Sequence, residues 1–90
     1  MRRFSLGVIV ATPAAIAQLQ REDIEGFPYL VRHARCDWGD MDAEDKARND
    51  RALIEGTRLM SAYRLPSGDK IWVITEADRS ATTILLPDDY

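Results

Sequence analysis

The pattern of hydrophobic and polar positions opens with a short apolar run, Phe4 to Ala11, that is rich in valine and isoleucine. Such a run is typical of a strand that is buried on both faces or lies centrally in a sheet. Thr12 and Pro13 then predict the start of a helix, because threonine can cap an unpaired N–H and proline at the first helical position gives up no needed donor. Ile16 and Leu19 give this helix one apolar side.

Two further helices are indicated before residue 57. Pro28 can open the second, which we expect to end near Cys36. Asp42 can cap a third helix over 43–55 that Gly56 stops. This third helix is mostly polar, so we expect it to lie at the surface.

The last third of the chain alternates between apolar and polar positions as strands do. Two such runs, 58–65 and 71–76, meet across a turn at 66–69, and a third covers 82–86. The second run places Trp72, Ile74 and Glu76 on one face and Ile71, Val73 and Thr75 on the other, and we expect Trp72 to serve the core. The sequence therefore predicts a single α+β domain over residues 1–90. An N-terminal strand and two or three helices precede a three-stranded antiparallel meander, with the helices on one face of a largely antiparallel sheet.

Length and charge narrow the classes of function. A chain of 90 residues is one domain that buries only about 60–65% of its unfolded surface, which disfavours a deep, enclosed substrate cavity. The net charge of −3 disfavours broad binding to nucleic acid, which needs a basic surface. A single cysteine allows no internal disulfide, and this suits a reducing cytoplasm, where we expect the protein to act.

The N-terminus resembles a signal peptide in having Met1, Arg2 and Arg3 before an uncharged run with small residues near Ala17. Gly7 and Pro13 interrupt that run, which favours an integral first strand. No segment reaches the roughly 18 apolar residues of a membrane span, so we expect no membrane association.

Known catalytic motifs are missing from the sequence: it has no Gly-rich phosphate loop, no nucleophile elbow, no paired CxxC and no two-histidine helix motif. His33 and Cys36 are one helical turn apart, with Asp37 and Asp40 nearby. One histidine and one cysteine are too few soft ligands for a zinc site. We therefore expect neither a metal nor a cofactor.

Two segments are candidate binding surfaces. Trp38, between Asp37 and Asp40, could be an exposed aromatic anchor, although tryptophans in small domains more often serve the core. The link between the last two strands holds Glu76, Asp78 and Arg79. The alternative to a binding surface is a purely structural role for this link, as a charged turn whose side chains pair with one another or cap backbone groups.

The same link contributes to an enzymatic alternative. Metal-independent cleavage of RNA needs a base for the 2′-hydroxyl and a cation for the phosphorane, and His33, Glu76 and Arg79 are residues of these types. This reading requires the three side chains to converge on one phosphate position.

Three segments, 32–39, 61–66 and 71–87, resemble a family of small bacterial proteins of unknown function. The most specific block is Ile-Thr-Glu-Ala-Asp-Arg-Ser at 74–80, and the likeness extends from about Val10 to Tyr90. Members are associated with plasmids and other mobile elements, and some carry the label of a type I restriction modification subunit. This chain has neither the length nor the motifs of a methyltransferase, and it has Cys36 where the family usually has glycine.

The resemblance implies a small accessory protein of mobile elements, and our leading hypothesis is one that binds another protein, a component of host defence or counter-defence, without catalysis. It would act as a monomer or a small homo-oligomer. The first alternative is the toxin-like ribonuclease. The second is a nucleic-acid-binding accessory that uses the arginines at 32, 35, 58 and 64, whose affinity would depend steeply on salt.

Overall fold

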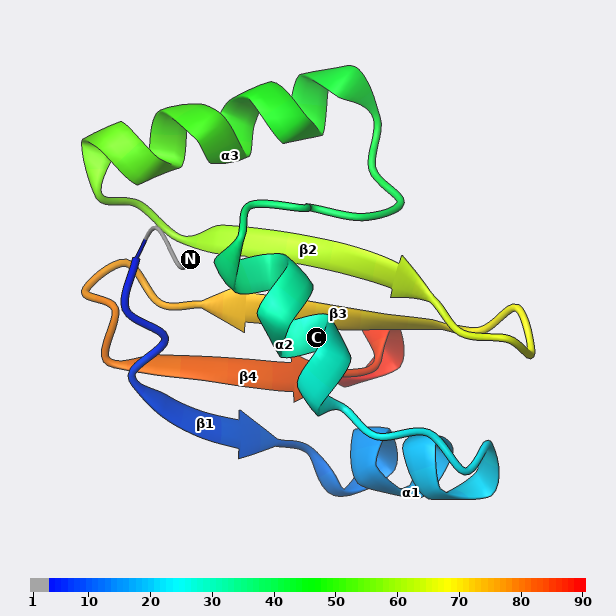
Figure 1. The fold of residues 1–90 in the computed structure, drawn as a ribbon. Helices are drawn as coiled ribbons and strands as arrows, with labels where there is room; N and C mark the ends of the chain where they lie inside the picture. Colours follow the sequence, from blue (N-terminus) through cyan, green and yellow to red (C-terminus); the bar gives the residue numbers. More distant parts are fainter. Residues whose placement is uncertain (1–3) are drawn as a thin grey trace.

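The computed structural model describes residues 4–90 and shows an α+β fold in which three α-helices accompany a mixed sheet of four strands (Figure 1). The strands are β1 (Val8–Ala11), β2 (Leu59–Arg64), β3 (Lys70–Thr75) and β4 (Ala81–Leu85), and the helices are α1 (Pro13–Arg21), α2 (Phe27–Ala34) and α3 (Ala43–Glu55), followed by a short 3-10 turn, η1 (Pro87–Asp89). The residues Met1, Arg2 and Arg3 of the signal-peptide reading lie outside the described chain.

The sheet has the order β1-β4-β3-β2, and β2, β3 and β4 form the antiparallel meander that the sequence predicts. Its first strand departs from that pattern, because β1 pairs with β4 in parallel, with Val8 opposite Ala81 and Ala11 opposite Ile84. A parallel pair needs a long crossover, and here α1, α2, α3 and the β2–β3 hairpin all lie between the two strands in sequence.

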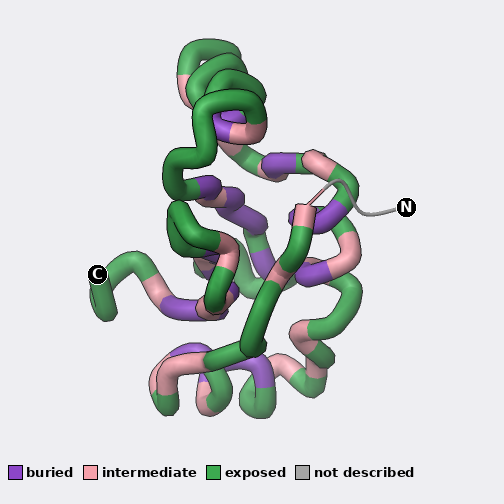
Figure 2. The backbone as a smooth tube through the Cα atoms, turned by 90° about the vertical axis from the view of Figure 1, so that its left-hand side faces the viewer, coloured by how far each residue is buried: buried purple, intermediate pink, exposed green. Residues whose placement is uncertain are grey.

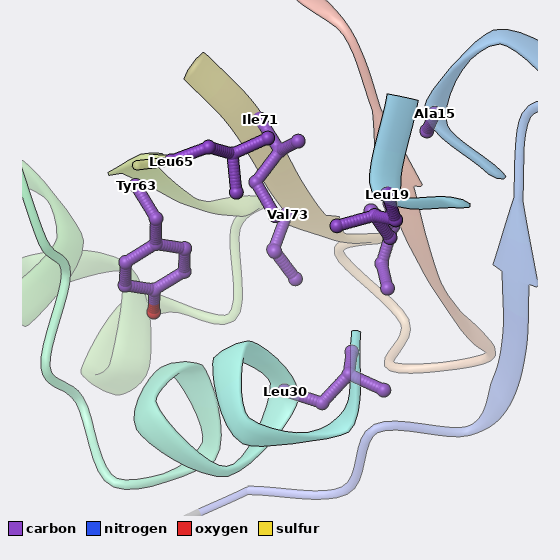
Figure 3. Packing of buried hydrophobic residues seen from close by; sticks show 8 residues of the cluster. Ala15, Leu19, Leu30, Tyr63, Leu65, Ile71 and Val73 are labelled. Atoms are coloured by element: carbon purple, nitrogen blue, oxygen red, sulfur yellow. The ribbon is translucent and has the colours of Figure 1, made fainter. Parts of the chain in front are cut away.

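Helices α1 and α2 pack on one face of the sheet and enclose the main core (Figures 1 and 3). Its buried apolar members come from both helices and all three meander strands: Ala15, Leu19, Leu30, Tyr63, Leu65, Ile71, Val73 and Ile84. Burying side chains of this size stabilises the fold by roughly 1.5–3 kcal/mol each. The other face carries Trp72 and the C-terminal turn, whose Tyr90 ring packs edge-on against the indole at 5.6 Å.

The helix ends form where the local sequence places them. Thr12 Oγ1 accepts a hydrogen bond from the Ala15 N–H at 3.1 Å, and Asp42 Oδ1 accepts from the Asp45 N–H at 2.8 Å. Gly56 ends α3 in the left-handed conformation, with φ 73°. The predicted bounds of α3 are confirmed, and Figure 2 shows this helix, at the top, as largely exposed.

Helix α3 lies along the outer edge of β2 instead of on the helix-covered face (Figure 1). The Asn49 side chain hydrogen-bonds both the N–H and the carbonyl of Met60. The preceding segment adds a short parallel bridge, in which the Ala62 N–H donates to the Trp38 carbonyl and the Ala62 carbonyl accepts from the Asp40 N–H. This edge of the sheet is thereby covered, which prevents strand addition there.

The prediction of a buried or central first strand is wrong. Strand β1 is the other edge of the sheet, and its Val8, Ile9 and Val10 side chains are 67%, 46% and 44% exposed. Figure 2 shows the chain running from the N-terminal end into β1 across the front of the molecule, partly intermediate at first and exposed along most of β1. The strand is apolar, as its sequence shows, but no other part of the described chain covers these side chains.

Candidate functional site

His33 is at the centre of a buried chain of polar side chains. Its imidazole has no exposed surface and lies between two strands' hydroxyls, with Nδ1 2.5 Å from Ser61 Oγ and Nε2 2.9 Å from Thr75 Oγ1. Thr75 Oγ1 is in turn 2.7 Å from Thr82 Oγ1, which donates to the Leu6 carbonyl at 2.7 Å. The polar atoms of this chain thus satisfy one another inside the fold.

The carbonyl at the end of this chain fixes the direction of every hydrogen bond in it. Because the Leu6 carbonyl can only accept, Thr82 donates to it and accepts from Thr75. Thr75 therefore accepts from the Nε2–H of His33, whose unprotonated Nδ1 accepts from Ser61. Burial, and then the positive charge of Arg79, lower the pKa of His33 to about 4, so the imidazole is neutral near pH 7.

This geometry removes the support for the ribonuclease alternative. A general base must reach the proton that it abstracts, and both ring nitrogens of His33 are occupied and enclosed. Ser61 beside His33 has the residue types of an activated nucleophile, but the serine also has no exposed surface. The pair therefore stabilises the interior.

Arg79 closes the C-terminal end of α3. Its guanidinium donates to the carbonyl of Ala52 in that helix at 3.1 Å and to that of Thr57 just beyond it at 2.7 Å. It also bonds the carbonyls of Glu76 and Ala77 within its own turn, at 3.1 and 3.3 Å. A cation at a helix C-terminus is favourable because the last carbonyls carry partial negative charge. These contacts already occupy the side chain that both the binding and the nuclease hypotheses use.

The acidic residues of the same link differ from each other. Asp78 Oδ1 accepts from the Ser80 N–H at 3.0 Å, and hydrogen bonds from Ser80 hold the pKa of this carboxyl below its usual range. Glu76 is exposed, and its carboxylate makes no hydrogen bond to any described residue. The link thus forms the charged turn of the structural alternative. Of its three charged side chains, Glu76 alone makes no hydrogen bond within the described chain.

Of the candidate surface around Trp38, the indole itself is buried. Trp38 is 4% exposed, and its Nε1–H donates to Asp50 Oδ1 at 3.1 Å. Asp37 pairs with Arg32 at 2.6 Å, and this hydrogen bond holds the pKa of the Asp37 carboxyl below its usual range. Asp40 pairs with two cations, Lys70 at 3.1 Å and Arg64 at 3.2 Å, and both lower the pKa of its carboxyl, the lysine more strongly.

Two of the four arginines proposed for nucleic-acid binding are paired with aspartates. Arg32 and Arg64 are paired with aspartates, as above, and Arg32 also stacks on the Tyr63 ring at 4.6 Å. Arg58 stacks on the Tyr90 ring at 5.3 Å. A paired arginine releases fewer counterions from phosphates, so Arg32 and Arg64 would contribute less to such binding than free charges would. Neither Arg35 nor Arg58 has an ion pair among the described residues.

A hollow of about 320 Å³ lies on the face of the sheet opposite α1 and α2. We call it the Trp72 hollow; its lining includes two methionines, two aromatic residues and two arginines, namely Met41, Met60, Trp72, Tyr90, Arg48 and Arg58. Trp72 is half-buried, and its indole N–H has no acceptor among residues 4–90. Aromatic residues, methionine and arginine are the types enriched at protein interfaces.

Sequence reasoning missed the Trp72 hollow because it assigned Trp72 to the core. A signal was present, since the alternation of β3 places Trp72 on the face opposite Ile71 and Val73. The hydroxyl partners of His33 also left a signal, because Ser61 and Thr75 occupy the inward positions of otherwise apolar strand faces.

No group of three potential metal ligands lies together in the part of the chain that the structure describes. Nor does any described helix have the length and apolar character needed to cross a membrane. Comparison of the chain with protein-family models, with curated proteins and with solved structures finds no match in any of the three.

Proposed function

We propose that this protein is a small, non-catalytic module that binds another protein through the Trp72 hollow. The observation that supports the proposal most directly is the half-buried Trp72, whose indole N–H is open to solvent beside two methionines and Tyr90. An indole with an apolar body and an unoccupied donor is a typical anchor for a protein partner.

The charges around the hollow define the chemistry of the partner. Arg58 rests on the Tyr90 ring, and Arg48 pairs with Asp45 at 3.2 Å on an exposed helix. A partner segment that inserts an apolar side chain between Met41 and Met60, and that carries a carboxylate beside it, would meet Arg58, which has no ion pair within the part of the chain that the structure describes. Arg48 is already paired with Asp45, which also lines the hollow. With the resemblance to mobile-element proteins, we propose that this partner is a component of host defence or counter-defence in the cytoplasm.

The placement of His33 and Arg79 also favours a binding role. His33 is enclosed and Arg79 is used to close α3, so these two groups do not meet Glu76 at an accessible point. A binding function asks only for an accessible surface of suitable chemistry.

The test is a capture experiment in the native host with tagged protein, reading both proteins and nucleic acids, followed by affinity measurements on any purified partner. Trp72→Ala and Arg58→Glu each alter the hollow, and Ile54→Ala is the matched control, since Ile54 is a fully solvated apolar residue of α3 with 88% exposure. Circular dichroism checks that every variant is folded.

We expect a partner that binds the wild type and Ile54→Ala equally and binds Trp72→Ala at least tenfold more weakly, in keeping with an interface anchor worth about 2 kcal/mol. Arg58→Glu should weaken binding most at low salt. A partner indifferent to both hollow variants would overturn the assignment of the surface. Enriched or freshly cleaved RNA, with no protein partner, would overturn the proposal in favour of the nuclease alternative.

A further inference from the structure

The uncovered edge of the sheet points to a second interaction surface, independent of the Trp72 hollow. Strand β1 carries Val8, Ile9 and Val10 in exposed positions, and beside it lies an apolar hollow of about 360 Å³. We call this the β1 hollow; its lining includes Leu6, Ile9, Phe27, Leu30, Val31 and Arg35. Phe27 is 68% exposed at this site. An apolar edge strand next to an apolar hollow is a surface that soluble proteins normally cover.

The backbone of β1 alternates between groups that face β4 and groups that face outward. The N–H groups of Val8 and Thr12 donate to the carbonyls of Ser80 and Ile84 in or beside β4. Because strand groups alternate, those of Ile9 and Ala11 point away from the sheet. No described residue bonds these outward groups. In Figure 1 β1 forms the lower border of the sheet, and α1 lies past the end of the strand instead of alongside it.

Two copies of this edge are complementary to each other. In an antiparallel pair centred on Val10, Ile9 of each copy lies opposite Ala11 of the other, and each such pair exchanges two N–H···O bonds. Four hydrogen bonds therefore satisfy the outward groups of both strands. Centring on Ile9 instead would oppose Ala11 to Gly7, whose φ of 65° takes the chain out of the extended conformation.

Charge also favours a second copy as the occupant. From Phe4 to Gln20 the chain has no charged residue, although 30% of all residues are charged. A protein of net charge −3 can therefore pair this strand with that of its own copy without placing like charges in contact along it. An oppositely charged partner would gain no ion pair from the strand itself.

The covered edge explains why association would stop at two copies. Asn49 and the segment around Trp38 occupy the outer groups of β2, so this edge cannot accept another strand. In the sheet that residues 4–90 form, the β1 edge alone remains, and a twofold pairing uses it in both copies at once. We propose that the protein forms a twofold homodimer by antiparallel β1–β1 pairing centred on Val10, joining two sheets of four strands into one of eight.

The first test measures mass against concentration by analytical ultracentrifugation. Two short strands and the flanking β1 hollow make a small interface, so the dimer should be weak and the series should extend to about 1 mM. The wild type should rise from 10.2 kDa toward twice that mass. Val10→Lys places two ammonium groups face to face at the centre of the pair and should remain monomeric. Ala11→Pro removes an outward N–H without touching the β4 ladder and should do the same.

The second test reads the register by disulfide trapping in a Cys36→Ser background. In the proposed pair the Val10 side chains of the two copies are direct neighbours, with Cβ atoms about 4.5–5.5 Å apart. Val10→Cys should therefore form a covalent dimer under mild oxidation. Val8→Cys is more exposed, but its two copies would lie about 13 Å apart along the strands and should not cross-link.

The outcomes separate this proposal from the proposed function. A wild type that stays monomeric to about 1 mM overturns the dimer, as does a dimer that persists in both Val10→Lys and Ala11→Pro. Cross-linking of Val8→Cys as fast as Val10→Cys overturns the register. If Trp72→Ala alone abolished the dimer, the self-association would have to be assigned to the Trp72 hollow instead of β1. Binding of a captured partner should be unchanged in Val10→Lys, because that surface lies on another part of the molecule.

Discussion

The side-chain amide of Asn49 replaces a neighbouring strand for Met60: Oδ1 accepts from the Met60 N–H at 3.0 Å, and Nδ2 donates to the Met60 carbonyl at 2.7 Å. A single helical residue thus supplies both bonds of a ladder position. This contact closes the β2 edge of the sheet and holds α3 against it.

We expect Asn49→Ala to lower the free energy of unfolding by about 2–3 kcal/mol, because it removes two hydrogen bonds and leaves backbone groups without partners. Asn49→Asp should cost at least as much although its shape is unchanged, since its carboxylate cannot donate to the Met60 carbonyl. Urea unfolding followed by tryptophan fluorescence measures both. Arg51→Ala, on the same helix and exposed, is the control and should change stability by less than about 0.5 kcal/mol. An equally small effect for Asn49→Ala would show that α3 does not depend on this contact.

The buried imidazole predicts a dependence of stability on pH. The folded-state pKa of His33 is about 4, below the value of about 6.5 for an unfolded chain, so the unfolded state takes up the proton first as the pH falls. The contribution is complete above about pH 6.5 and is lost as the pH falls toward 4. Between about pH 7.5 and pH 5 we expect unfolding to become easier by about 2 kcal/mol.

His33→Gln should flatten this dependence, because glutamine does not titrate in the range. Denaturant unfolding at several pH values provides the comparison, and the lowered pKa values of Asp37 and Asp40 confine their own effect to more acidic solution. A wild-type stability that stays constant down to pH 5 would contradict the enclosed, neutral imidazole.

Arg79 should matter for stability more than for recognition. Its four carbonyl contacts predict that Arg79→Ala costs about 2–3 kcal/mol, because hydrogen bonds from a charged donor are the stronger kind. Arg79→Lys should recover less than half of this, since an ammonium group cannot reproduce the planar fork of donors. Thermal unfolding distinguishes the two variants. A nearly neutral Arg79→Ala would instead free this side chain for the binding role that the sequence suggested.

Two glycines with similar backbone angles should respond differently to alanine. Gly39 has φ 80° and Gly56 has φ 73°, so both substitutions force a left-handed alanine, at about 1 kcal/mol. A Cβ at Gly56 meets nothing within 4 Å, whereas one at Gly39 would lie 2.1 Å from the Ala62 carbonyl oxygen. We expect Gly56→Ala to lower the melting temperature by about 4–8 °C and Gly39→Ala to lower it several times as much. Equal shifts in melting temperature would mean that the Gly39–Ala62 bridge can move apart at little cost in free energy.

Local signals in the sequence were sufficient to predict where the helices lie. Asp42 and Gly56 fix the ends of α3 through contacts within four residues, so its bounds could be predicted without any knowledge of the rest of the fold. No such local signal marks Cys36, whose backbone has φ 65°. Glycine is the residue that adopts this left-handed angle without steric cost, so a cysteine there gives no hint of it.

Strand pairing and the candidate site depend on contacts between residues far apart in the sequence, so neither could be predicted from local patterns. An apolar run such as Val8–Ala11 is the same whether a strand becomes central or an edge, and only the pairing with β4 decides between them. The hydroxyl partners of His33 lie 28 and 42 residues away, in strands whose inward faces had to be known first. Trp72 was placed on the correct strand, but the helix-covered face is settled by packing.

The parallel pairing of β1 with β4 has a consequence for synthesis on the ribosome. In the described chain β1 is ordered by β4, so its apolar side chains remain without a partner until residue 85 has left the exit tunnel. Closing so long a loop makes the sheet slow to complete compared with the local hairpin of β2 and β3. The helices and this hairpin can assemble first, and the arrival of β4 then joins the earliest strand to them.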